Sequence, residues 1–68
     1  MPDFECRLKK YRQLKELTQE QLAQQVGVRR ETIMRLEKAQ YNPSLKLAMD
    51  IAKVFQVAVE DLFEFTED

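Results

Sequence analysis

The chain contains no histidine and no tryptophan, and among its 68 residues it has one cysteine, one glycine and two prolines. Without histidine, a Cys–His nucleophile is excluded. A single cysteine, Cys6, supports neither a disulfide framework nor a zinc site and fits a reducing compartment. The sequence also lacks a glycine-rich phosphate loop and any metal-ligand cluster. We therefore expect neither an enzyme nor a protein that holds a cofactor or metal.

Long apolar runs are also missing. No segment approaches the length needed to span a bilayer, and the N-terminal MPDFECRLKK lacks the apolar core of a signal peptide. We expect a soluble, cytoplasmic protein with no membrane partner. Residues 1–68 are predicted to form a single domain. Because a hydrophobic core of this size is marginal on its own, a homodimer is expected.

The net charge of −1 is unevenly distributed. Residues 1–43 carry nine Lys or Arg against six Asp or Glu, whereas residues 44–68 carry two against six. A basic first half beside an acidic end gives one face suited to phosphate. Small charged surfaces are often uneven by chance, so this asymmetry is weak evidence alone.

The single glycine, Gly27, follows Ala23 by four residues and precedes Ile33 by six. Glycine adopts positive φ without a Cβ clash, as a sharp turn between two helices requires. Ala23 is small enough for a crossing helix, while Ile33 and Leu36 share one helical face. This spacing is typical of a helix-turn-helix, whose second helix enters the DNA major groove.

The remaining apolar pattern predicts an all-α domain of five helices. A first helix covers about residues 7–15, with Leu8, Tyr11 and Leu14 or Lys15 buried. Thr18 and Gln21 form a capping box that begins the next helix, and the helix-turn-helix core spans 18–38. After the loop 39–43, Ser44 caps a helix that buries Leu45, Ala48, Ile51, Ala52 and Phe55. A last helix covers 59–63, and residues 4–6 and 63–66 are predicted as short terminal strands.

The stretch LTQEQLAQQVGV followed by RRETIMRLEKAQYNPSLKLAMDIAKVFQVAVEDLF resembles the Cro and phage-repressor family, also called XRE. The resemblance runs from about Leu8 to Phe65. It implies a repressor-like fold and a short stand-alone DNA-binding regulator. Three positions depart from the family pattern: Arg29 replaces a capping Ser or Thr, and Ala39 and Gln56 each replace a glycine after a helix.

The resemblance assigns the family's base-contacting positions to Arg29, Arg30, Glu31 and Arg35. Their chemistry suits this role because arginine can donate two hydrogen bonds to guanine and a carboxylate can accept one from cytosine. A solvated face with an internal Glu31–Arg35 pair is the alternative interpretation. Thr32 and Met34 lie on the same helix and are assigned to the wider DNA contact.

Gln19 begins the second helix, where backbone N–H groups can hold a phosphate. The resemblance implies that Gln19 also contacts the DNA backbone and braces the recognition helix, here against Arg30. Backbone contacts are likewise implied for the rim after that helix, Lys38, Gln40, Tyr41 and Asn42. For each of these residues, an ordinary solvent-exposed loop position is an equally good interpretation.

The resemblance gives Arg12 and Glu37 a structural role. In related repressors an arginine of the first helix pairs with a glutamate near the end of the recognition helix. We therefore expect a bidentate, partly buried ion pair. The competing interpretation makes Arg12 a phosphate contact.

The C-terminal end carries more apolar side chains than a small domain readily buries. Val59, Phe63 and Phe65 are predicted to meet a second copy in a homodimer.

Together these observations predict a sequence-specific regulator that binds double-stranded DNA, a repressor by family analogy, on a palindromic operator. The alternative is a protein-interaction module, such as an antitoxin or adaptor, whose acidic end engages a basic partner.

Overall fold

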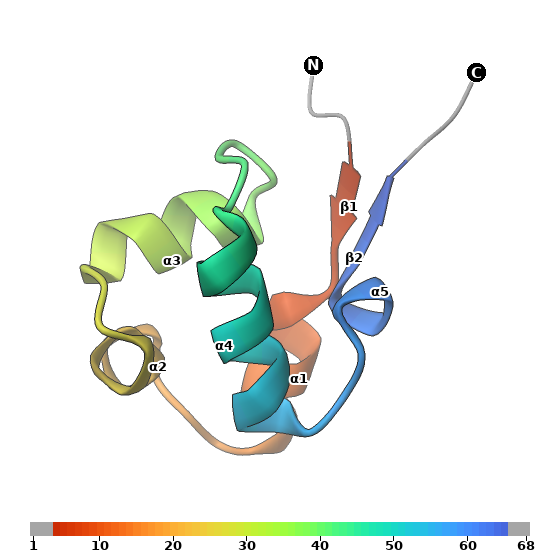
Figure 1. Cartoon of the computed structure of the whole chain (residues 1–68). Helices are drawn as coiled ribbons and strands as arrows, with labels where there is room; N and C mark the ends of the chain where they lie inside the picture. The colour runs from red at the N-terminus through yellow and green to blue at the C-terminus, as the bar shows by residue number, and fades with distance from the viewer. Residues whose placement is uncertain (1–3, 66–68) are drawn as a thin grey trace.

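A computed structural model describes residues 4–65. The elements follow one another as β1 (Phe4–Cys6), α1 (Leu8–Leu14), α2 (Gln19–Val26), α3 (Arg30–Glu37), α4 (Leu45–Phe55), α5 (Val59–Leu62) and β2 (Phe63–Phe65). The predicted all-α domain with short terminal strands is confirmed, with helix ends shifted by a residue or so. In Figure 1, α4 lies at the centre, α2 and α3 lie on one side, and the two strands lie together on the other. No helix within the described residues is long and apolar enough to cross a membrane.

The core is formed by one apolar face from each helix. Six large side chains are completely buried, namely Leu8, Leu22, Ile33, Leu36, Ile51 and Leu62. Burying a side chain of this size contributes about 1.5–3 kcal/mol relative to leaving it exposed. These residues come from all five helices, so the same core fixes α3 against α1, α2 and α4.

The turn between α2 and α3 is formed as predicted. Thr18 Oγ1 accepts a hydrogen bond from the Gln21 N–H, and Gln21 Oε1 accepts one from the Thr18 N–H. This capping box begins α2, and Gly27 ends it at φ +73°. A Cβ at Gly27 would meet nothing within 4 Å, so the backbone conformation, and not lack of space, favours glycine here.

Two of the three departures from the family pattern lie where the backbone is left-handed. Ala39 and Gln56 both adopt φ +56°, the left-handed conformation that a glycine would hold with less strain. Arg29 caps α3 in an extended conformation without a side-chain cap hydrogen bond. The left-handed conformation is thus present at two of the three positions although glycine is missing there.

The two strands form an antiparallel sheet that joins distant parts of the chain. Phe4 pairs with Phe65, Glu5 with Glu64, and Cys6 with Phe63. Arg7 binds the Glu64 carboxylate, and this hydrogen bond raises the pKa of the Arg7 guanidinium. The predicted second strand included Thr66, which lies outside the described residues.

Three side chains differ from the predicted burial. Leu14 is 71% exposed, so the buried stripe of α1 consists of Leu8 and half-buried Tyr11. Lys15 is exposed as well, and its Nζ donates to the Val54 carbonyl. Leu45 is 75% exposed and Leu47 is buried in its place. Leu47 shares a helical face with Ala48 and Ile51, whereas Leu45 lies outside that face.

Candidate nucleic-acid interface

The second helix of the helix-turn-helix, α3, has one buried and one solvent-facing side. Ile33 and Leu36 anchor it in the core. Arg29, Arg30, Glu31 and Arg35, predicted to read bases, are all exposed. Figure 1 shows α3 along one edge of the molecule, with no other element on its outer side. An exposed helix carrying guanidinium and carboxylate groups has the shape and donors needed for a major groove.

These charged groups have no partner within the part of the chain that is described. None of the ion pairs among residues 4–65 includes Arg29, Arg30, Glu31 or Arg35. The internal Glu31–Arg35 pair of the alternative interpretation is therefore not formed. The donors on this face remain available to a ligand.

The other predicted contact residues surround this face at different depths. Thr32 and Met34 are half-buried on α3. Lys38, Gln40, Tyr41 and Asn42 are exposed in the segment that follows α3. The Gln40 N–H donates to the Arg35 carbonyl at 2.9 Å, which holds the start of this segment against the end of the helix.

A buried carboxylate fixes the position of α3. Arg12 of α1 donates from Nε to Glu37 Oε2 at 2.6 Å and from Nη2 to Oε1 at 3.3 Å. The Glu37 side chain is only 5% exposed. Arg12 Nη1 also donates to the Leu17 carbonyl at 2.8 Å, which ties the segment before α2 into the same network. One guanidinium thus joins α1, the segment before α2, and α3.

Gln19 completes this network in a way that differs from the expectation. Its Nε2 donates to Glu37 Oε1 at 3.0 Å, so the residue braced by Gln19 is Glu37, and Arg30 remains unbonded to it. The expected Arg30 partner was wrong because Glu37 lies at the end of α3 nearest Gln19. Nothing in the sequence distinguishes Glu37 from the other carboxylates as the shared acceptor.

The predicted dimer residues fall into two groups. Phe63 is only 5% exposed and packs edge-on against Phe4, with ring centroids 5.9 Å apart. The ring of Phe63 thus belongs largely to the core, and a contact between Phe63 and a partner stays a prediction. Phe65 is 64% exposed, and Val59 is half-buried. Leu45 and Met49 of α4 are also exposed, although neither was expected on this surface.

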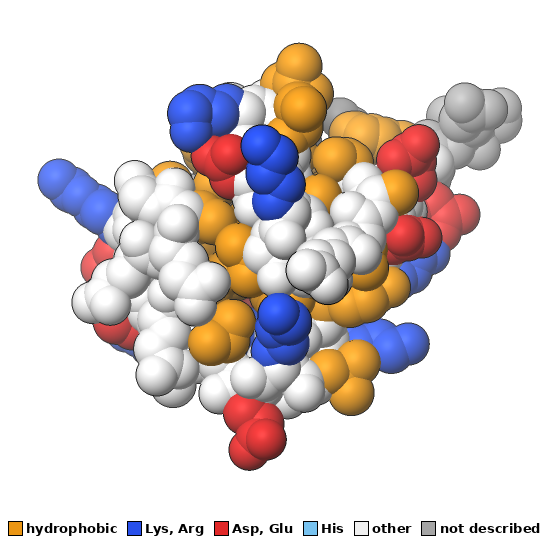
Figure 2. Space-filling view, turned by 60° about the horizontal axis from the view of Figure 1, so that its bottom comes forward, with side chains coloured by type: hydrophobic (Ala, Val, Ile, Leu, Met, Phe, Trp, Pro, Cys, Tyr) orange, Lys and Arg blue, Asp and Glu red, His pale blue; other side chains and the backbone are white. Residues whose placement is uncertain are grey.

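The charge distribution separates the two ends of the domain. Glu60, Asp61 and Glu64 are exposed on α5 and β2, and the Asp61 carboxylate accepts a hydrogen bond from the Ala58 N–H. Figure 2 shows acidic side chains gathered at one edge, beside the grey terminal residues. Within residues 4–65, no group of three or more Cys, Asp or Glu side chains could hold a metal ion.

Comparison with known proteins agrees with this geometry. A family model described as helix-turn-helix matches residues 8–62. A transcriptional regulator of the helix-turn-helix type from Archaeoglobus fulgidus is 58% identical over 62 residues, covering 91% of this chain and 87% of the relative. A second such regulator, from Methanocaldococcus jannaschii, is 55% identical over 62 residues, covering 91% of this chain and 94% of the relative.

Solved structures show the same arrangement. The restriction-modification controller protein from Aeromonas hydrophila superposes with a TM-score of 0.76 at 33% identity, covering 84% of this chain and 86% of that one. The SOS-response transcriptional repressor LexA from Eubacterium rectale gives a TM-score of 0.78 at 27% identity, covering 88% and 64%.

The fold and its exposed α3 therefore define a DNA-binding protein of the helix-turn-helix class. The chain belongs to the XRE-type helix-turn-helix family and is a transcriptional regulator.

Proposed function

We propose that this regulator is a repressor that acts in the cytoplasm as a homodimer on a palindromic operator. The observation that carries this proposal is the exposed, unpaired set of arginines on α3, held in place by the buried Glu37. Arg29, Arg30, Glu31 and Arg35 would read base edges. Residues 1–68 would act as one domain, with the helix-turn-helix core at 18–38.

Backbone contacts would surround this reading surface. Lys38, Tyr41 and Asn42 would touch phosphate on one flank, with Thr32 and Met34 packed along the groove. Gln19 lies at the first position of α2, where unpaired N–H groups favour an anion. Its side-chain amide already donates to Glu37 and the Gln21 N–H to Thr18, so the backbone N–H groups of Gln19 and Glu20 are the phosphate donors we propose.

Repression needs only occupancy, because a dimer over a promoter blocks polymerase. LexA from Eubacterium rectale is itself described as a transcriptional repressor. Two-fold symmetry would place identical α3 helices about one DNA turn apart, roughly 34 Å, in successive major grooves. The operator would then be a palindrome whose half-site spacing matches this distance.

Selection of bound sequences from a random duplex library tests the proposal directly. We expect a palindromic consensus, and transcription in vitro from a promoter overlapping it should fall as protein is added. An Arg30→Ala/Arg35→Ala variant is the control and should not repress. A direct-repeat consensus would overturn the palindrome, and increased transcription would overturn repression.

Salt dependence separates this function from a protein-interaction module. If a dimer neutralises about 6–10 phosphates, log K should fall with log[salt] at a slope of roughly −5 to −9. The net charge of −1 does not cancel this slope, because counterions are released locally at the phosphates. A flat response with no selected consensus would favour an interaction module with a basic partner.

A further inference from the structure

An apolar hollow of about 280 Å³ lies beside the DNA-facing loop. We call it the α4–sheet groove. Its walls come from the loop after α3 (Asn42 and Pro43), the start of α4 (Leu45), the start of α5 (Val59) and strand β2 (Phe63 and Phe65). None of the residues that line it carries a charge. Such a surface is suited to an apolar partner.

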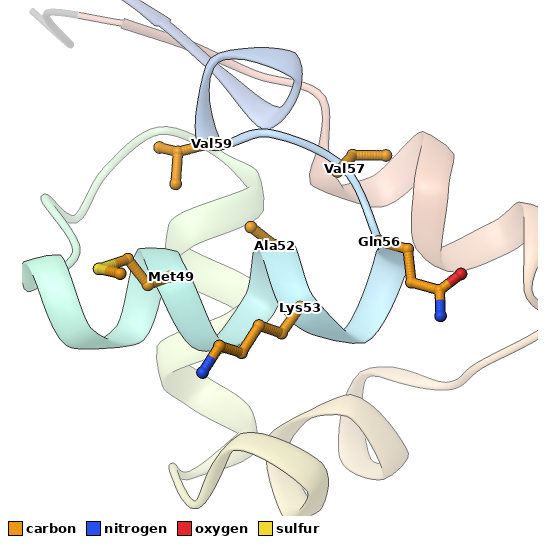
Figure 3. A pocket seen from close by; sticks show the side chains of 6 residues that line it. All are labelled: Met49, Ala52, Lys53, Gln56, Val57 and Val59. Carbon is orange, nitrogen blue, oxygen red and sulfur yellow. The ribbon is translucent and has the colours of Figure 1, made fainter.

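The groove continues onto the outer side of α4. A second, shallower hollow of about 430 Å³ shares Val59 with it and is lined on the α4 side by Met49 and Lys53. Figure 3 shows Met49 and Lys53 projecting from α4, with Val59 across from Met49 at the start of α5. Leu45 and Met49 lie one helical turn apart, so the exposed apolar side chains form a continuous strip along α4.

The shape of this surface fits a second copy of the same chain. Phe65 is 64% exposed at one wall of the groove and Leu45 is 75% exposed at another. A two-fold contact requires a patch that is complementary to itself. A protruding aromatic ring beside an apolar hollow meets that requirement, because each copy's Phe65 can enter the other's groove. Large exposed aromatic side chains are also the residues that most often anchor interfaces.

The groove also reaches the proposed DNA contacts. Asn42 and Pro43 form its wall, while Tyr41 and Asn42 are exposed in the segment proposed to touch phosphate. This segment begins at Ala39, which is held at φ +56°. A partner packed against Asn42 and Pro43 would restrict the loop before DNA arrives. Restricting a binding segment in advance lowers the entropic cost of the binding that follows.

We propose that a second copy of this chain docks in the α4–sheet groove with Phe65, and that the loop 40–43 couples this docking to DNA contact. The proposal rests on the homodimer and operator proposed above and adds the link between the two sites. Dimerisation then raises the affinity of each protomer for its own half-site. This effect is separate from the gain in affinity that comes from binding two half-sites at once.

Sedimentation of single variants tests the docking surface. Phe65→Ala and Leu45→Ala should each weaken dimerisation by roughly 30-fold, as expected for an interface anchor. Leu14→Ala is the matched control, since Leu14 is equally exposed on α1 but does not line the groove. If both groove variants dimerise as tightly as the control, the groove is not the contact. Phe63 is avoided because its loss would also damage the core.

Binding to a short duplex that holds one half-site tests the coupling. Such a duplex removes the gain in affinity that comes from two linked half-sites. The DNA is kept at trace concentration so that each dimer binds at most one duplex. Per protomer, the wild-type dimer should bind about fivefold or more tightly than monomeric Phe65→Ala, within the usual range of coupling between sites. Wild-type protein diluted below its dimer dissociation constant should match the variant.

The possible failures are distinguishable. Equal half-site affinities for dimer and monomer, with the palindrome still bound tightly by the dimer, would overturn the coupling and leave the proposed function standing. Failure of the wild-type protein to select any sequence would overturn the proposed function itself.

Discussion

Arg12 and Glu37 lie 25 residues apart in the chain, yet their side chains form two hydrogen bonds and are only 11% and 5% exposed. Removing one partner of a buried pair leaves an uncompensated charge and costs roughly 3–5 kcal/mol. We therefore expect Arg12→Ala to lower the melting temperature markedly in the absence of DNA. Calorimetry of the free protein measures this.

The chain supplies a control for that experiment. Lys46 and Asp50 form an ion pair on the surface of α4, where the Lys46 side chain is highly exposed. Lys46→Ala should change the free energy of unfolding by about 0.5 kcal/mol or less, as is usual for exposed pairs. Unchanged melting of Arg12→Ala with weaker DNA binding would instead make Arg12 a phosphate contact.

Base recognition is expected to reside in Arg30, Glu31 and Arg35, together with Arg29. Each bidentate contact is worth about 1–3 kcal/mol of discrimination, so Arg30→Ala should weaken operator binding and relax one base position. Lys38→Ala should weaken binding to all sequences about equally. Comparing selected consensus sequences of the two variants measures the difference. A folded variant with all four residues changed to alanine that kept its preference would refute the assignment.

The reactivity of the single thiol depends on burial. Burial raises the pKa of the Cys6 thiol above its ordinary value, so the unfolded chain loses this proton first as pH rises. The contribution of Cys6 to stability is complete below the unfolded-state pKa and falls as pH rises through the folded-state pKa. Alkylation by iodoacetamide between about pH 7 and 10 should show a higher midpoint in native buffer than in denaturant. A native midpoint equal to or below the denatured one would contradict this.

Relieving a left-handed residue should stabilise the fold. Gln56 is exposed at the end of α4 with φ +56° and ψ +44°. A side chain in this conformation costs roughly 1–2 kcal/mol, and glycine would remove that cost. Glycine also stabilises the unfolded chain through its greater conformational freedom, which offsets about 0.4–1 kcal/mol of the gain. Gln56→Gly should thus stabilise the protein by about 0.5–1 kcal/mol and raise Tm by about 2–8 °C.

Ala39→Gly makes the comparison sharper. Ala39 has the same φ as Gln56, but its methyl group packs against the core. Glycine there relieves the same strain and loses that packing, so the gain should be smaller. A Gln56→Gly variant that melts below the wild type would show that the left-handed position is not strained.

The helices and the turn could be predicted because their signals are local. The capping box of Thr18 and Gln21, the glycine at 27 and the spacing of Ile33 and Leu36 each act within a few residues. Side-chain partners across the fold could not be predicted in this way. Gln19 and Glu37 are 18 residues apart in sequence, and only the packing of α2 against α3 brings their side chains together. Likewise, burial of Phe63 and exposure of Leu45 depend on how the last strand and α4 rotate against the core.

The register of the sheet, with Phe4 opposite Phe65, has a consequence for the order of folding. Helices α1 to α4 contact one another without either strand, so these contacts can form before the sheet closes. β1 must wait for its partner strand, because no other strand is available among residues 4–65. Contacts between residues this distant in sequence are the slowest to form. We therefore expect closure of the sheet, and of the groove wall that Phe65 forms, to be the last step of folding.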